Sequence, residues 1–211
     1  MKVGVIFFHK NVYDIYPSKW VNKCIDSIYE QTHSDLNFYE INYGVDKLQL
    51  VKGSKFFSVV KENYADAMNF IISEAFSDGC DYIFNTNLDD HYSDKRIEKQ
   101  LEILEMGFDI VSSDFCYIDS DDMITHYMNI VKNGPIKKCL EMDINVIAHP
   151  VVGMSKKFWT DDNNRYDITK TPSEDLDLWK RSINNYKFYI IDDILLFYRR
   201  HNNQVSEKNK L

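Results

Sequence analysis

The sequence has little glycine or proline, with 7 and 4 in 211 residues, and it has no long apolar run. No two glycines are separated by a single residue and no Gly-Lys-Ser/Thr sequence occurs. The phosphate-binding loops of Rossmann dehydrogenases and P-loop enzymes are therefore absent. A Gly-x-Ser-x-Gly elbow is also missing, and the six histidines lack the close helical spacing of zinc proteases. Apolar runs such as 3–8 fall far short of the roughly 20 residues that span a bilayer.

The sequence also lacks an excess of basic residues. The 25 basic residues are outnumbered by 33 acidic ones, so the net charge is −8. Such a chain has no basic field for a nucleic-acid backbone, and we exclude nucleic acid as a partner. An anionic ligand would need a metal ion or a few local cations. The four cysteines stand too far apart for a zinc pair or a disulfide framework, and with no signal peptide they predict a cytoplasmic protein with reduced thiols.

The hydrophobic pattern predicts one α/β domain. Short apolar strands alternate with helices through the first half, with strands expected over 2–8, 36–42, 56–60, 81–86 and 108–112 and with helices capped by Ser18 and Ser93 and opened by Asn63. This alternation predicts a mostly parallel, doubly wound sheet with helices on both faces. The second half is less regular, with strands expected within 117–131, 143–148 and 186–199 and a capped helix over 173–183. We expect a single domain over 1–206, with halves 1–112 and 113–206, and a frayed tail over 207–211.

Oxygen ligands follow the strand 82–86 directly. Asn87, Asp89 and Asp90 stand where that strand ends, and ligands of doubly wound sheets bind at such ends. Adjacent carboxylates gain most from a hard divalent cation, which also holds a diphosphate. The alternative is that Asp89 or Asp90 caps the next helix, and the pattern alone does not separate the two readings.

Two further clusters carry possible chemistry. Glu174 and Asp175 fall in the first turn of a predicted helix, where a carboxylate either serves as a general base or only complements the helix dipole. Arg199, Arg200 and His201 follow an apolar strand, where they either bind phosphate and metal or belong to a solvated tail.

The order of these pieces resembles a small GT-A-fold glycosyltransferase of the family-2 type, over nearly the whole chain from Lys2 to Ser206. The resemblance is carried by four groups of residues in the family's order: the first strand and helix at 3–11 and 24–32 with Ala67, Met68 and Asn69; Asn87-Leu88-Asp89-Asp90; Glu174 and Asp175 with Leu178, Trp179 and Arg181; and Tyr198, Arg199 and His201. Four motifs in order are far more specific than any one of them.

The resemblance implies transfer of a sugar from a nucleotide-sugar, with a UDP-sugar as the expected donor, to a glycan or other hydroxyl acceptor. It implies a divalent cation, Mn or Mg, held by Asp89 and His201, and a general base at Asp175 beside Glu174. The halves 1–112 and 113–206 would bind the donor and the acceptor. The expected donor-binding positions are His9, Asn42, Tyr43, Asn69, Asn87, Asp90 and Arg199. Of these, His9 replaces the family's usual residue after the first strand and would either reach the nucleotide or lie at the rim.

Departures from the family pattern leave alternatives open. Asn87 replaces the first acid of the Asp-x-Asp motif and brings no charge. The acid usually found after the second strand has no clear counterpart, and Asn42, Tyr43 and Asp46 are the candidates for contact with the base. An inert nucleotide-sugar or glycan-binding module is the second hypothesis. A sugar nucleotidyltransferase is the third, but it needs a glycine-rich loop that 7–16 does not supply.

Overall fold

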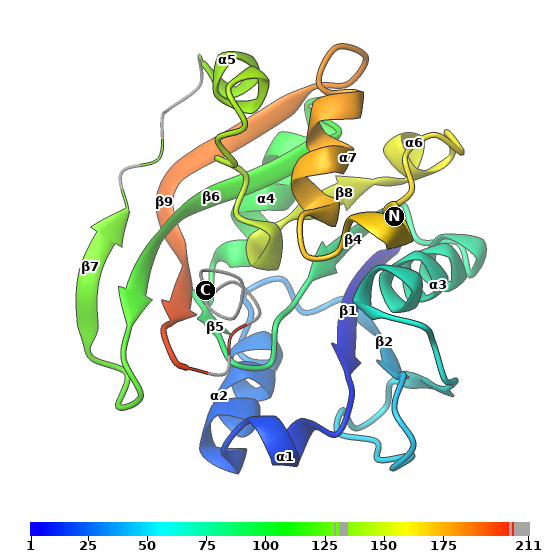
Figure 1. Cartoon of the computed structure of the whole chain (residues 1–211), viewed down its shortest axis with the longest axis vertical. Coiled ribbons are helices and arrows are strands. Elements are labelled where there is room, and N and C mark those ends of the chain that lie inside the picture. Colours follow the sequence, from blue (N-terminus) through cyan, green and yellow to red (C-terminus); the bar gives the residue numbers. More distant parts are fainter. Residues whose placement is uncertain (129, 131–134, 203, 205–211) are drawn as a thin grey trace.

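The computed structural model describes residues 1–128, 130, 135–202 and 204. The expected frayed tail 207–211 and the end of the strand segment 117–131 lie outside the described residues. A single nine-stranded sheet runs through both halves of the chain (Figure 1). Its strands are β1 (Val3–His9), β2 (Leu36–Asn42), β3 (Lys55–Ser58), β4 (Tyr82–Asn85), β5 (His91–Tyr92), β6 (Ile110–Ile118), β7 (Ile124–Met128), β8 (Gly153–Ser155) and β9 (Phe188–Arg199).

The sheet is mixed rather than mostly parallel. Its strand order is β3-β2-β1-β4-β8-β6-β9-β5, and β7 pairs with the outer part of β6. The pairs β1–β2, β1–β4, β2–β3 and β6–β9 are parallel, whereas every pair that involves β5, β7 or β8 is antiparallel. Because β8 runs antiparallel to both β4 and β6, the strands β1, β4, β6 and β9 end at the same edge of the sheet.

Helices cover both faces of the sheet, which confirms the predicted α/β class. The helices are α1 (Val12–Ile15), α2 (Ser18–Tyr29), α3 (Tyr64–Ser77), α4 (Arg96–Glu105), α5 (Ile136–Glu141), α6 (Lys156–Trp159) and α7 (Glu174–Ser182), with 3-10 turns η1 (His149–Val151) and η2 (Ile168–Lys170). Along β1, Ile6 and Phe8 pack with α3 and α7, while Val5 and Phe7 pack with α2 and α4. This alternation follows from the two-residue period of a strand and builds two cores.

Helix ends agree only in part with the sequence prediction. Asn63 opens α3 as expected and caps it, accepting a hydrogen bond from the Asp66 amide, and Gly79 and Gly107 end their helices with positive φ angles of 94° and 89°. Ser18 is wrong as a cap, because Pro17 precedes the helix and Ser18 is its first residue. Ser93 is also wrong, because the side chain of Gln31 accepts from the Ile97 amide instead.

The second half differs more from the prediction. Residues 143–148 form no strand, and 188–199 form one long strand, β9, instead of two short ones. The pairing of β6 with β9 shifts register beside Ser113 and Asp114, which marks a bulge. Beyond it, β6, β7 and β9 extend past the end of β4 and curve away from the rest of the sheet (Figure 1).

Candidate active site

The loop after β4 meets the end of β9 at Asp89 and His201. The Nε2 atom of His201 lies 3.0 Å from Oδ2 of Asp89, and both side chains are almost fully buried. The ring of His201 lies against two aromatic rings, Tyr16 at 5.5 Å and Trp20 at 5.2 Å between centroids. The two metal ligands implied by the resemblance are thus brought together from positions 112 residues apart in the sequence.

Asp90 points inward from the same loop. Its Oδ1 accepts a hydrogen bond from the Arg199 amide at 2.8 Å, and its Oδ2 is buried with no hydrogen-bond partner among the described residues. Burial, and then the neighbouring Asp89 charge, raise the pKa of this carboxyl well above its usual range. Asp90 therefore supports the loop from within.

Arg199 does not face an open site, which corrects the expected donor contact. The side chain is fully buried, and all three guanidinium nitrogens have protein partners. Nε donates to the Asp89 carbonyl at 2.8 Å, Nη1 donates to the Asp119 carbonyl at 2.6 Å, and Nη2 pairs with the Asp122 carboxylate. Because the guanidinium has no exposed surface and each of its nitrogens already binds the protein, it does not reach a diphosphate.

The side chain of Asn87, in the loop after β4, has a hydrogen-bond acceptor that no described residue uses. Its Oδ1 is buried without a partner among the described residues. Its backbone is held by Tyr92, whose hydroxyl accepts from the Asn87 amide at 2.7 Å and donates to the Pro150 carbonyl at 3.2 Å. An unpartnered buried acceptor of this kind suits a hydroxyl donor such as a ribose.

Glu174 and Asp175 begin α7, whose long axis crosses one face of the sheet (Figure 1). Oδ2 of Asp175 accepts from the Asn145 amide at 2.8 Å, and Oδ1 accepts from the Leu176 backbone at 2.7 Å. Glu174 is 7% exposed, its Oε2 has no partner in the described chain, and burial raises its pKa. Ser173 precedes the helix but makes no side-chain cap.

A buried polar cluster beside Asp175 was missed in the sequence. His149 lies in η1, with Tyr166 Oη 2.9 Å and Asn85 Nδ2 3.3 Å from its Nε2, and Tyr64 Oη 3.3 Å from its Nδ1. Burial lowers the pKa of His149, and the Asp175 charge opposes that shift. The cluster connects α3, β4 and η1 to the start of α7. No local pattern marks His149, because its partners come from three distant segments.

His9 ends β1 and pairs with a buried glutamate. Its Nε2 lies 2.9 Å from Oε1 of Glu40, a carboxylate with no exposed surface. Glu40 also accepts from the amides of Leu50 and Val51 at 2.6 and 3.0 Å and from the Ser54 hydroxyl at 2.8 Å. This carboxylate fixes the loop 48–54 against β2. His9 Nδ1 is buried and unpartnered among the described residues.

Asn42 and Asn69 hold the protein's own chain, and for Asn42 this corrects the expected donor contact. Asn42 donates to Asp46 at 2.6 Å and accepts from the Gly44 amide at 3.0 Å. Asn69 donates to the Tyr166 carbonyl at 2.8 Å and accepts from its amide at 2.9 Å. Asn42 is fully buried and also donates to the Leu48 carbonyl at 3.0 Å, so it is not available to a nucleotide, whereas Asn69 is only partly buried and its donor contact stays a prediction.

Tyr43 and the exposed Asp46 remain candidates for contact with the base. The Tyr43 amide donates to the His9 carbonyl at 3.0 Å, so Tyr43 lies beside the end of β1. The Nζ atom of Lys10 lies 5.9 Å from the centre of the Tyr43 ring. Burial raises the pKa of its hydroxyl, which therefore stays protonated.

A ready-made group of three His, Cys, Asp or Glu ligands does not occur in the part of the chain that the structure describes. Asp89 and His201 supply one carboxylate oxygen and one imidazole nitrogen at hydrogen-bond distance, a donor set that suits a divalent cation when a diphosphate supplies further oxygens. No helix among the described residues has the length and apolar character to cross a membrane.

Comparisons with known proteins bear on the fold and on the sequence. No family model matches the chain. The O-antigen biosynthesis glycosyltransferase WbnJ of Escherichia coli is 27% identical over 205 residues, which are 90% of this chain and 78% of the relative. Among solved structures, S. aureus TarS matches with a TM-score of 0.68 over 95% of this chain and 37% of its own, at 14% identity. TarS in complex with UDP-GlcNAc matches with a TM-score of 0.70 over 100% of this chain and 62% of its own, at 11% identity.

The chain thus spans less than two thirds of the TarS structures that it matches. At that level of identity the structural likeness concerns the fold, while WbnJ carries the similarity in sequence. Because the fold, the order of the motifs and the sequence similarity agree, the chain is a glycosyltransferase with a GT-A-like fold.

Proposed function

We propose that this chain is a family-2-type, metal-dependent enzyme that transfers a sugar from a UDP-sugar to a hydroxyl acceptor with inversion. The observation that carries the proposal is the Asp89–His201 pair. It lies just beyond the end of β4, where Asp89 and Asn87 belong to the same loop. The UDP and UDP-GlcNAc complexes of TarS support a nucleotide-sugar donor, and the WbnJ relative supports a glycan acceptor.

Asp89 and His201 would hold Mn or Mg. The cation supplies positive charge that offsets the charge of the departing diphosphate. Of the two, Mn tolerates an imidazole ligand better, because Mg strongly prefers oxygen. Asn87 would orient the ribose through its unpartnered Oδ1, and His9 and Tyr43 would border the base.

Asp175 would accept the proton of the acceptor hydroxyl. As the hydroxyl oxygen bonds to the anomeric carbon, the bond from that carbon to the diphosphate breaks and UDP leaves, so no covalent enzyme intermediate is needed. Asn145 and the Leu176 amide fix the Asp175 carboxylate in one orientation. Glu174 is buried whereas Asp175 is partly exposed, so Asp175 is the better placed of the two to meet an acceptor hydroxyl.

The test is a panel of nucleotide-sugars with and without Mn, monitored for slow hydrolysis of the donor in the absence of acceptor. We expect UDP release from one UDP-sugar in the presence of metal. Asp175→Asn should retain UDP binding and lose transfer by several orders of magnitude, because the amide keeps the shape and cannot accept the proton. Full turnover in that variant would exclude Asp175 as the base.

An inert nucleotide-sugar or glycan-binding module is the second candidate, because Asn87 brings no charge to the metal motif. Metal-dependent UDP binding without hydrolysis or transfer for any donor in the panel would favour this second function.

A further inference from the structure

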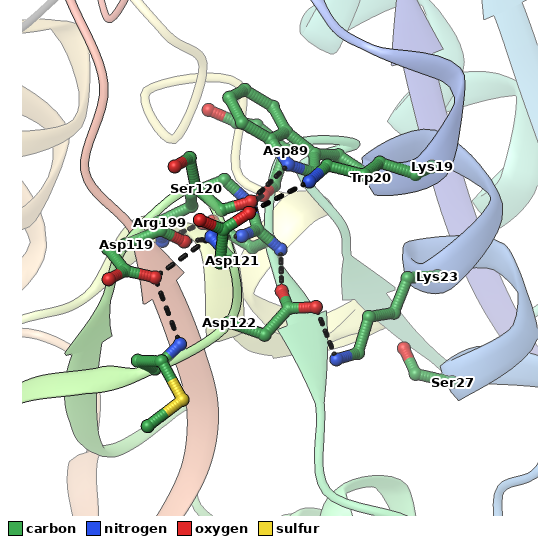
Figure 2. Close-up of polar contacts among 12 residues, drawn as sticks. Lys19, Trp20, Lys23, Ser27, Asp89, Asp119, Ser120, Asp121, Asp122 and Arg199 are labelled. Carbon is green, nitrogen blue, oxygen red and sulfur yellow. Dashed lines mark hydrogen bonds and ion pairs between the residues drawn. The ribbon is translucent and has the colours of Figure 1, made fainter.

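Arg199 joins three parts of the molecule that are far apart in the sequence (Figure 2). Its backbone amide and Nε bind the Asp89–Asp90 loop, while its outer nitrogens bind the turn between β6 and β7. Its guanidinium carbon lies 4.8 Å from the centre of the Trp20 ring on α2. A planar cation between an aromatic ring and a carboxylate is held in one position.

The β6–β7 turn, residues 119–122, has a defined shape of its own. Oδ1 of Asp119 accepts from the amides of Asp121 and Met123 at 2.9 and 3.0 Å. Asp122 has a φ of 66°, in the left-handed region, and this conformation accompanies its carboxylate reaching Arg199. The turn is therefore shaped by its own hydrogen bonds.

Helix α2 holds the turn from the other side. Trp20 Nε1 donates to the Ser120 carbonyl at 3.1 Å, and the Lys23 ammonium lies 2.8 Å from the Asp122 carboxylate. Figure 2 places Asp122 between Lys23 and Arg199. Burial acts to raise the pKa of Asp122, but Lys23 and Arg199 together outweigh it, and the net pKa is lowered. Asp122 is consequently an anion between two cations.

The same residues also border the candidate metal ligands. Trp20 contacts both the Arg199 guanidinium and the His201 ring. Arg199 is two residues from His201 and donates to the carbonyl of Asp89, so one side chain constrains both members of the Asp89–His201 pair. Mutation of a residue that contacts the metal ligands, without touching the metal itself, typically changes metal affinity by roughly 10- to 100-fold.

We propose that Arg199 is a positioning residue, and that the turn 119–122 acts through it to hold Asp89 and His201 at the spacing needed for a cation and a UDP diphosphate. The inference rests on the proposed function, because it concerns the same metal and donor. It differs from the donor contact implied by the family resemblance, since Arg199 itself does not touch the donor. Its distinctive consequence is that Asp122, a residue of a β-turn, controls metal-dependent donor binding.

The chain offers a matched control in the same turn. Asp121 and Asp122 are adjacent acids, and each pairs with a lysine of α2, Lys19 at 3.2 Å and Lys23 at 2.8 Å. Asp121 is 77% exposed at its side chain and has Lys19 as its ion-pair partner among the described residues. Asp122, in contrast, is 33% exposed and contacts Arg199. Asp121→Asn and Asp122→Asn therefore make the same change in charge and size.

The experiment measures UDP binding by calorimetry, with Mn and with EDTA, for the parent chain and for both variants. We expect Asp122→Asn to weaken Mn-dependent UDP binding by about tenfold or more and Asp121→Asn to change it by less than twofold. Binding in EDTA should be equal in all three proteins. Arg199→Lys should retain more of the Mn-dependent binding than Arg199→Met, because lysine restores one charged donor. Thermal unfolding verifies that each variant is folded.

Equal losses in Asp121→Asn and Asp122→Asn, or equal losses with Mn and with EDTA, would overturn the inference while the proposed function stands. UDP binding by the parent that is the same with Mn and with EDTA would overturn the metal role and this inference together. These outcomes distinguish a failure of the positioning residue from a failure of the proposed function.

Discussion

The substitution Glu40→Gln tests how the first half of the chain is held together, because Glu40 is a fully buried carboxylate beside β1 with four hydrogen-bond partners. Its two oxygens accept from four donors, two of which are backbone amides. A glutamine has the same shape, but one of its two terminal atoms donates hydrogen bonds instead of accepting them.

Either orientation of the glutamine loses one backbone amide. If the NH₂ group replaces Oε1, His9 can accept from it by presenting an unprotonated Nε2, but the Leu50 amide at 2.6 Å faces another donor. If the NH₂ group replaces Oε2, the Ser54 hydroxyl can rotate to accept, but the Val51 amide at 3.0 Å faces a donor. The loss of one hydrogen bond to a charged group, with a buried donor left unpaired, costs about 2 kcal/mol.

In a chain of this length, about 2 kcal/mol corresponds to a fall of roughly 4 to 8 °C in melting temperature. The assay is thermal and urea unfolding followed by circular dichroism, with Glu62→Gln as the control because Glu62 is exposed. UDP binding should weaken as well, since the loop 48–54 loses its anchor. Identical unfolding free energies for Glu40→Gln and Glu62→Gln would refute the reasoning.

Three further predictions concern the core, the base and pH. Gly153→Ala should destabilise the fold by about 1 to 3 kcal/mol in urea unfolding, because the added Cβ would lie 2.8 Å from the Phe84 ring; an unchanged midpoint would contradict this. Asn145→Ala should lower kcat about tenfold with little change in the donor KM, because Asp175 loses one charge-assisted hydrogen bond; a change confined to KM would argue against an orienting role. Because burial lowers the pKa of His149, the folded state favours its neutral form, so this contribution to stability is present above the ordinary histidine pKa of about 6.5 and is lost as the pH falls below it. Melting temperatures measured from pH 7.5 to 5 should therefore fall less steeply in His149→Gln than in the parent.

Local signals in the sequence predicted the first half of the fold well. β2 runs over Leu36–Asn42 as expected, and Asn63 and Gly79 bound α3 because capping and left-handed backbone depend on single residues. The prediction that Ser93 caps the next helix was wrong, because a serine caps a helix only if its geometry permits. Here Gln31, just after the end of α2, supplies the acceptor for the Ile97 amide.

Long-range contacts account for what the sequence did not predict. The pairing of Asp89 with His201 follows the motif order, but the burial of Arg199 depends on a turn 80 residues away. Asn42 and Asn69 carry the residue type of a ligand contact, yet their amides are used by nearby and distant backbone. Residues 143–148 have the apolar content of a strand but form a loop that brings Asn145 to Asp175. None of these contacts produces a periodic pattern in the sequence.

The hydroxyl of Tyr92 has a consequence for motion in this enzyme. It bridges the Asn87 amide and the Pro150 carbonyl, and so connects the loop after β4 to the 3-10 turn that contains His149. Tyr92→Phe would remove both hydrogen bonds while leaving the ring in the core, and we expect the two segments to move more independently in that variant.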